Sequence, residues 1–174
     1  MTASFLAALS ADGPAVDRAG KMDLYGWLIG AWELDVTRFP ANEPPLKLKG
    51  EWHFGWVLEG RAIQDVWIVP PRGARHGDAV ANKNAYGCTL RIYDPASDAW
   101  QIQWTDPVTQ NFCAMTGRRD GDDIVQLGRN AAGQAIRWSF SQITPDSFRW
   151  RGETSPDGGA SWRLDVEFFA TRIA

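Results

Sequence analysis

The stretch from residue 50 to residue 71 constrains the fold most, because large apolar side chains alternate with polar ones along it. Alternation with a period of two is typical of a β-strand that buries one face. Glu59 and Gly60 interrupt the alternation, so the stretch is expected to form a β-hairpin. Its second strand carries Arg61 and Asp65 on the same face as Trp67. Because an unpaired charge is costly inside a core, this face is expected either to hold a polar site within an aromatic cavity, or to carry a pair that fixes the strand register or faces solvent.

Strand-like alternation continues from Ala31 to the C-terminus, and turn signals recur at about the 8–12-residue spacing of sandwiches and barrels. The pattern predicts about ten antiparallel strands joined mostly by tight turns. Such a meander either stays open as a sandwich or closes as a barrel, and closure removes the exposed edges. We therefore expect an all-β, antiparallel, up-and-down β-barrel, which is wide enough to hold a small ligand.

The first 29 residues are expected to be helical and to cap one end of the barrel. Phe5, Leu6 and Leu9 fall at helical spacing, and Asp23 is expected to begin a second helix that ends near Leu28. Residues 30–174 are then the barrel, in a chain that forms a single domain overall. The loop at 70–81 has no periodicity and is expected to act as a lid or flap.

Charge and composition argue against several classes of partner. The formal net charge is −3 and no run of Lys or Arg occurs, so no nucleic-acid partner is expected. No stretch approaches the ~20 apolar residues of a spanning helix, and the N-terminus lacks a basic leader, so a cytoplasmic protein without a membrane partner is the default. Cys88 and Cys113 lie in separate predicted strands and are expected to be free, buried thiols.

Four segments carry a resemblance to known barrels. The triplet Gly30-Ala31-Trp32 resembles the G-x-W start of calycin and lipocalin-like barrels, in which the Trp packs at the closed end. The segments GRAIQDVW (60–67), YGCTLRIYDPASDAW (86–100) and FRWRGETSPDGGASWRL (148–164) are similar to a bacterial group of lipocalin-like proteins of unknown function, the DUF1579-like group. The resemblance covers most of the chain from Gly30 onward; it implies the barrel fold and names no catalytic residues.

Nitrobindin-like barrels are a second comparison, and they bind haem through a histidine in their C-terminal part. This chain has only His53 and His76, both in its first half. We therefore expect no haem, and with no clustered His or Cys ligands we expect no structural metal and no other cofactor.

Ten Trp in 174 residues is far above ordinary usage and favours an aromatic cavity. The expected ligand-binding residues are six tryptophans and three polar residues on central strands: Trp52, Trp56, Trp67, Trp104, Trp138, Trp150, Tyr86, Arg91 and Asn111. Arg137 and Glu153 are further polar groups that either face inward or, for Arg137 with Arg149 and Arg151, form an external charged ladder.

Three functions stay open at this point. The first is binding of a small, largely apolar, aromatic molecule inside the barrel. The second is a cofactor-independent isomerase, cyclase or lyase with Asp65 as acid or base and Arg61 or Tyr86 holding the substrate. The third is a filled barrel that acts only through protein association, and a homodimer is left open. A cavity of a few hundred Å³ would separate the first two from the third.

Overall fold

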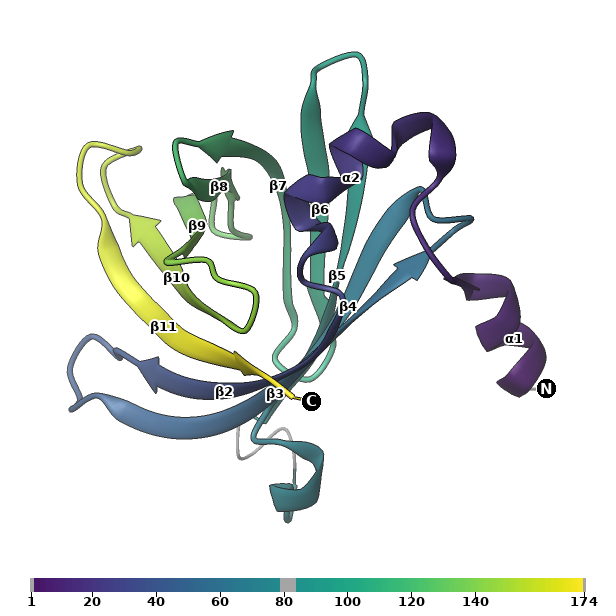
Figure 1. Ribbon diagram of the computed structural model, residues 1–174. Helices are drawn as coiled ribbons and strands as arrows, with labels where there is room; N and C mark the ends of the chain where they lie inside the picture. Colours follow the sequence, from purple (N-terminus) through teal and green to yellow (C-terminus); the bar gives the residue numbers. More distant parts are fainter. Residues whose placement is uncertain (1, 79–83, 174) are drawn as a thin grey trace.

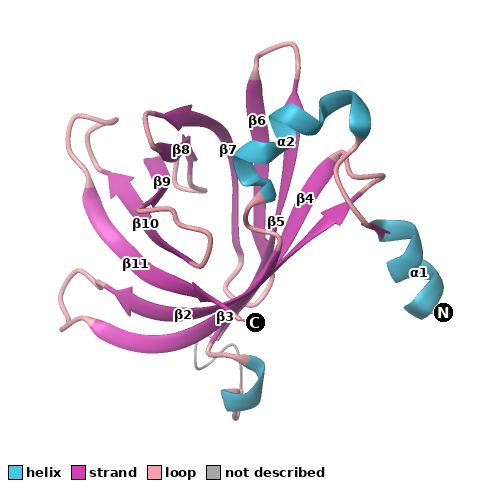
Figure 2. Cartoon of the chain, viewed as in Figure 1, coloured by secondary structure: helices cyan, strands magenta, loops and turns pink. Residues whose placement is uncertain are grey.

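The computed structural model describes residues 2–78 and 84–173, and β-strands are its main secondary structure (Figure 2). The helices are α1 (Thr2–Leu9) and α2 (Ala19–Gly26), with short 3-10 turns at Val16–Arg18 and Arg72–Ala74. The strands are β1 (Ser10–Ala11), β2 (Gly30–Arg38), β3 (Leu46–Val57), β4 (Ala62–Val69), β5 (Ala85–Asp94), β6 (Ala99–Asp106), β7 (Asn111–Asp120), β8 (Asp123–Arg129), β9 (Ala135–Ser141), β10 (Ser147–Ser155) and β11 (Arg163–Arg172).

The ten strands from β2 to β11 form a closed antiparallel barrel, as the sequence predicted. Each strand pairs with the next along the chain, and β11 returns to pair with β2, so that Phe168 lies opposite Val36. The two-residue strand β1 adds to β3 outside this circuit. Closure leaves no long unpaired edge among these ten strands.

Inward-facing side chains follow the predicted alternation. On β2 the residues Trp32, Leu34 and Val36 are buried and their neighbours are exposed or partly exposed. Trp32 donates from Nε1 to the Leu28 carbonyl oxygen at 2.7 Å, and the Arg172 guanidinium lies 4.1 Å from its ring centroid. The tryptophan of the G-x-W triplet is therefore fixed at the end of the barrel that the N-terminal segment covers.

Helix α2 covers that end, because its Met22 and Tyr25, with Leu28 just after the helix, are fully buried in the core. The Tyr25 hydroxyl occupies the space beside Gly117, where a Cβ atom would overlap it. The helix begins at Ala19, so the expectation that Asp23 caps its N-terminus is wrong. A 3-10 turn at Val16–Arg18 leads directly into the helix, which therefore starts about one turn before the position that the apolar spacing indicated.

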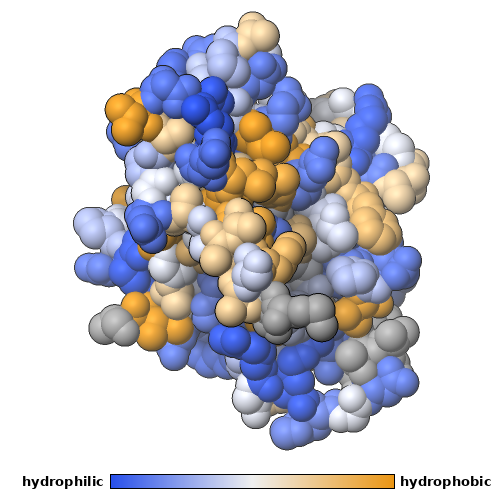
Figure 3. Space-filling view, turned by 90° about the vertical axis from the view of Figure 1, so that its right-hand side faces the viewer, coloured by the Kyte–Doolittle hydropathy of each residue, from blue (hydrophilic) through white to orange (hydrophobic). Residues whose placement is uncertain are grey.

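Helix α1 does not cap the barrel but projects from it (Figure 1). Its Phe5 and Leu6 side chains are 65% and 54% exposed. On the face that carries α1, apolar side chains gather in the middle and polar ones surround them (Figure 3). In the described part of the chain, no helix is long and apolar enough to cross a membrane.

The β3–β4 hairpin corrects the expectation for Arg61. Leu58, Glu59 and Gly60 all have positive φ (53°, 57° and 72°), so the turn extends to Arg61 and β4 starts only at Ala62. Arg61 thereby leaves the barrel wall, and its Nη1 donates to the Asp17 carboxylate at 2.8 Å, where both side chains are largely exposed. The predicted pairing of Arg61 with Asp65 is wrong.

Two further predictions concern the loop at 70–81 and the charged residues on the outside of the barrel. Residues 79–83 lie outside the described part of the chain, so the predicted lid at 70–81 is only partly described. The external charged ladder is confirmed: Arg137 pairs with Glu153 at 2.8 Å, and both Arg149 and Arg151 lie within 3.5 Å of Glu167.

Candidate functional site

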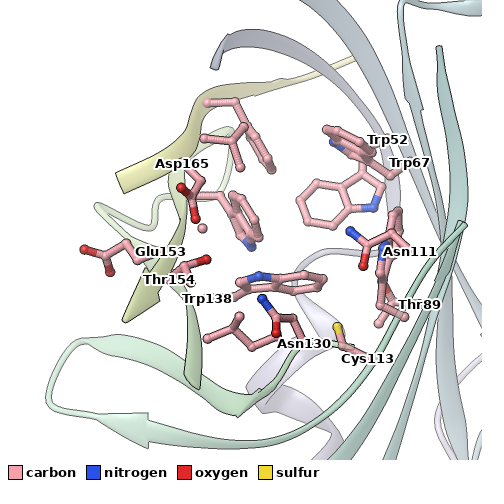
Figure 4. Close-up of a pocket in the computed structure, with 16 residues that line it drawn as sticks. Trp52, Trp67, Thr89, Asn111, Cys113, Asn130, Trp138, Glu153, Thr154 and Asp165 are labelled. Carbon is pink, nitrogen blue, oxygen red and sulfur yellow. The ribbon is translucent and has the colours of Figure 1, made fainter. Parts of the chain in front are cut away.

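A cavity of about 230 Å³ lies inside the barrel, at the end opposite α2. Its wall comes from eight of the ten barrel strands and from the β8–β9 loop. Figure 4 shows Trp52, Trp67, Asn111 and Trp138 around one space, whereas the Glu153 carboxylate extends away from it. The lining residues are Trp52, Trp67, Thr89, Trp104, Asn111, Cys113, Asn130, Ile136, Trp138, Trp150, Gly152, Glu153, Thr154, Asp165, Val166 and Phe168.

Five of these side chains form a closed circuit of aromatic contacts, which we call the aromatic belt: Trp67, Trp104, Trp138, Trp150 and Phe168. Successive ring centroids around the circuit are 5.9, 6.0, 5.3, 4.7 and 6.3 Å apart, ending where it began. Most contacts are edge-to-face, an arrangement that aromatic quadrupoles favour. The belt therefore surrounds the cavity with ring edges and faces that are held by one another.

Two glycines make room for the belt. A Cβ atom on Gly87 would overlap the Trp104 indole, and a Cβ atom on Gly152 would lie 2.7 Å from Cη2 of Trp150. Both positions are closer than real Cβ contacts allow. The sequence thus pairs each of these large indoles with a neighbour that has no side chain.

Three buried indole N–H groups of the lining have no acceptor among the described residues. They belong to Trp52, Trp67 and Trp150. Trp32 and Trp27 differ, because their Nε1 atoms donate to backbone carbonyl oxygens at 2.7 and 2.9 Å. A buried donor without an acceptor costs about 1–3 kcal/mol, so each of these N–H groups would be stabilised by an acceptor placed beside it.

The floor of the cavity rests on a buried ion pair. Asp65 accepts a hydrogen bond from Arg91 Nη1 through one oxygen and from the Thr89 backbone N–H, at 3.1 Å, through the other. The Arg91 guanidinium also lies 6.0 Å from the centroid of Trp52, whose indole lines the cavity. Neither Asp65 nor Arg91 lines the cavity itself.

The rim of the cavity is polar. The amide groups of Asn111 and Asn130 and the carboxylate of Asp165 point toward the space (Figure 4). Strict alternation along β11 would place Asp165 on the face opposite Val166 and Phe168. A bulge in β11 causes the difference: the β10–β11 register passes directly from Val166 to Leu164, so Asp165 is the extra residue and is turned inward.

Cys113 is the thiol of the cavity wall. Partial burial among apolar groups raises its pKa to about 11, because the thiolate is poorly solvated there. The group is therefore a protonated thiol at neutral pH and a poor nucleophile. Both Cys113 and Cys88 are free, as the sequence predicted, although each is only partly buried.

A wider and more open hollow of about 690 Å³ adjoins the rim. It shares five lining residues with the cavity: Trp67, Trp104, Asn111, Asp165 and Val166. Other residues of its wall come from the end of β2, the loop after it and the β6–β7 loop. We call this hollow the mouth, because it connects the cavity to the surface.

Six of the nine predicted ligand-binding residues line the cavity: Trp52, Trp67, Trp104, Asn111, Trp138 and Trp150. Three do not. Trp56 packs beside Gly26 of α2 at the other end of the barrel, and Tyr86 is on the outer surface, where the Arg75 guanidinium lies 5.2 Å from its ring centroid. Arg91 is buried beneath the floor with Asp65.

Sequence reasoning did not single out Thr89, Cys113, Asn130 or Arg38 for the site. The sequence pattern could have identified Arg38, since it continues the inward face of β2, and it lines the mouth in the structure. Asn130 lies in the turn between β8 and β9, where no sequence pattern indicates the direction of a side chain.

Among residues 2–78 and 84–173, no three His, Cys, Asp or Glu side chains are grouped closely enough to hold a metal ion.

Fold and site together define a closed ten-stranded antiparallel barrel with an aromatic internal cavity. No family model matches the sequence, and no curated protein matches it. The solved structures that share the fold include the following two. Rv2717c from M. tuberculosis has a TM-score of 0.62 and 12% identity over 90% of this chain and 99% of the other. The S-type phycobiliprotein lyase CPES from Guillardia theta has a TM-score of 0.57 and 11% identity over 92% of this chain and 99% of the other.

Proposed function

We propose that the barrel binds a small, flat, aromatic molecule in the cavity, with acceptor atoms that meet the indole N–H groups. The aromatic belt carries this proposal, because its five mutually packed rings enclose a space of about 230 Å³ without filling it. Flat aromatic ligands stack on such rings and bury their apolar faces. Carbonyl or similar oxygens on the ligand would satisfy the N–H groups of Trp52, Trp67 and Trp150.

The competing functions have less support. An enzyme that uses Asp65 lacks contact between this carboxylate and the cavity, since both of its oxygens are held by Arg91 and Thr89. Two lining residues have carboxylates, Glu153 and Asp165, and each carboxylate pairs with an arginine. A filled barrel is disfavoured by the cavity itself. One barrel of similar fold is named a phycobiliprotein lyase, so catalysis is compatible with the fold.

Membership of the DUF1579-like group is part of the same proposal. It rests on the segments 60–67, 86–100 and 148–164, which lie in β4, β5, β6, β10 and β11 of the barrel. A partner other than a small molecule is not needed to account for the cavity.

Nuclear magnetic resonance of the indole N–H groups tests the binding proposal. Titration with 2-naphthamide, a neutral flat molecule with a carbonyl acceptor, should shift the Trp52, Trp67 and Trp150 signals with one-site stoichiometry. The Trp32 and Trp27 signals should stay in place, because their N–H groups already have acceptors. Equal shifts in all five signals would contradict a ligand in the cavity.

A pair of cysteine variants provides the matched control. Cys113→Phe places a ring into the cavity and should abolish binding, whereas Cys88→Phe adds the same ring on β5 outside the cavity lining and should preserve it. Calorimetric titration of both variants separates the two. Retained affinity in Cys113→Phe would show that 2-naphthamide binds elsewhere.

A further inference from the structure

Arg38 lies at the C-terminal end of β2 and lines the mouth. Trp32, Leu34 and Val36 set the inward face of β2, and Arg38 continues that face. Its strand neighbour on β11 is Val166, which lines both the mouth and the cavity. A guanidinium is thus placed on the inner side of the wall, where the mouth meets the aromatic cavity.

Arg38 forms no hydrogen bond or ion pair with the described residues, although it is partly buried. Burial lowers the pKa of its guanidinium, and the nearby Asp106 carboxylate raises it. Asp106 is itself occupied: its oxygens accept from the backbone N–H groups of Val108 and Thr109 and from the Thr109 hydroxyl, at 2.8–3.2 Å. Arg38 therefore keeps its five donors available.

The other charged side chains around this space are matched. Asp165 pairs with Arg163 at 2.7 Å, and Glu153 pairs with Arg137 at 2.8 Å. Arg38 is the one charged group of the described mouth and cavity lining that has neither an ion pair nor a hydrogen bond. A partly buried guanidinium without a protein partner can be paired by an anion from outside.

We propose that the ligand of the cavity is an anionic aromatic molecule, whose ring lies within the aromatic belt and whose carboxylate is held at the mouth by Arg38. This inference rests on the proposed function and adds the charge of the ligand. The planar guanidinium matches a carboxylate in two parallel hydrogen bonds, and such charge-assisted bonds are about twice as strong as neutral ones. Because Trp67, Trp104 and Asn111 line both spaces, a single molecule can occupy them together.

Comparison of 2-naphthoate with 2-naphthamide tests this charge requirement, because the two probes share ring size and planarity. Calorimetric titration of the wild-type protein should give an affinity for 2-naphthoate at least about tenfold higher. Arg38→Met should reduce the ratio to about one, mainly by lowering the affinity for 2-naphthoate. Arg38→Lys should keep part of the preference for 2-naphthoate, since lysine retains the positive charge but cannot form the two parallel hydrogen bonds of a guanidinium.

Arg119→Met is the matched control, because it removes the same charge from an exposed site near the other end of β7. The preference for 2-naphthoate should survive in this variant. Equal affinities of the wild-type protein for both probes would overturn the anion inference and leave the binding proposal intact. A preference that persists in Arg38→Met would also overturn it. Absence of binding by either probe would instead contradict the proposed function, and the inference would fall with it.

Discussion

Arg91 and Asp65 form an ion pair inside the barrel, with each residue only 1% exposed. Arg91 lies on β5 and reaches across to β4, where Asp65 is opposite Thr89. The rings of Tyr25, Phe54 and Trp52 surround the guanidinium, with centroids 5.4–6.0 Å from its central carbon. The pair therefore links the buried end of the barrel, closed by α2, to the floor of the cavity.

Breaking this pair should destabilise the protein strongly. Asp65→Asn or Arg91→Met alone should lower the free energy of unfolding by about 3–5 kcal/mol, because the remaining group is buried without its partner. The double variant Asp65→Leu/Arg91→Met should recover much of that loss. Urea unfolding of the four proteins, with midpoints and slopes compared, measures the effect.

The control for this experiment is Arg61→Met. Arg61 also pairs with an aspartate, but the Arg61–Asp17 pair is exposed, so its loss should change the free energy of unfolding far less than the loss of the buried pair. If Arg61→Met and Arg91→Met lowered the free energy of unfolding equally, burial of the Asp65–Arg91 pair would not explain the loss.

Gly117 and Tyr25 should be coupled, because the Tyr25 hydroxyl fills the space where a residue 117 side chain would begin. Gly117→Ala should displace the ring and destabilise the α2 cap by about 1–3 kcal/mol. Tyr25→Phe should be nearly neutral, since the hydroxyl has no hydrogen-bond partner among the described residues. The double variant should therefore be more stable than Gly117→Ala alone.

Thermal unfolding of this set, followed by circular dichroism, gives the coupling energy. Gly55→Ala on β3 is the matched control, since a Cβ atom at that position would meet nothing within 4 Å. It should be neutral or slightly stabilising. Strict additivity of Gly117→Ala and Tyr25→Phe would refute the steric explanation.

Glu51 should contribute a pH-dependent stability. Two hydrogen bonds from the Arg72 side chain, together with its backbone N–H, lower the pKa of Glu51 to about 2, from 4.5. The folded pKa is the lower one, so the contribution is complete above pH 4.5 and is lost as the pH falls toward 2. Because Arg72 is largely exposed, the contribution should be only about 1–2 kcal/mol.

Urea unfolding at several pH values between 2 and 6 tests this contribution. Glu51→Gln should reduce the loss of stability below pH 4.5, whereas Glu43→Gln, in the exposed loop after β2, should leave the wild-type curve unchanged. A Glu51→Gln curve that parallels the wild type would show that the carboxylate gains nothing from Arg72.

Local patterns in the sequence were sufficient to predict the barrel fold and many of the aromatic residues that line its cavity. The period-two alternation on β4 placed Asp65 and Trp67 on one face, and both face the interior. Trp56 obeys the same rule on β3 and still misses the cavity, because it lies at the α2 end of its strand. Alternation gives the face of a residue but not its depth along the barrel axis.

The partner of Asp65 depended on non-local structure. Whether Arg61 or Arg91 meets Asp65 depends on where β4 begins and on the β4–β5 register, which pairs Ile63 with Arg91 across a long loop. The position of Asp165 depends on a related feature, since a single bulge in β11 reverses the direction of one side chain. Neither the register nor the bulge leaves a signal in the local sequence pattern.

Cys113 supplies a chemical test of where an aromatic ligand binds. Because its pKa is about 11, the reactive thiolate fraction should increase about tenfold for each pH unit up to that value. Iodoacetamide should therefore alkylate Cys113 slowly at pH 7 and about tenfold faster at pH 8. Mass spectrometry of a Cys88→Ser variant, which leaves Cys113 as the single thiol, gives the rate.

Saturating 2-naphthamide should slow this alkylation at every pH, because the Cys113 thiol lines the space that the ligand would occupy. The Cys113→Ser variant keeps Cys88, which lies outside the cavity lining, and its alkylation rate should not change with ligand. Protection of both thiols would indicate a general tightening of the barrel. Protection of neither, under conditions where calorimetry shows binding, would place the ligand outside the cavity, because a molecule within the aromatic belt must shield Cys113 from the reagent.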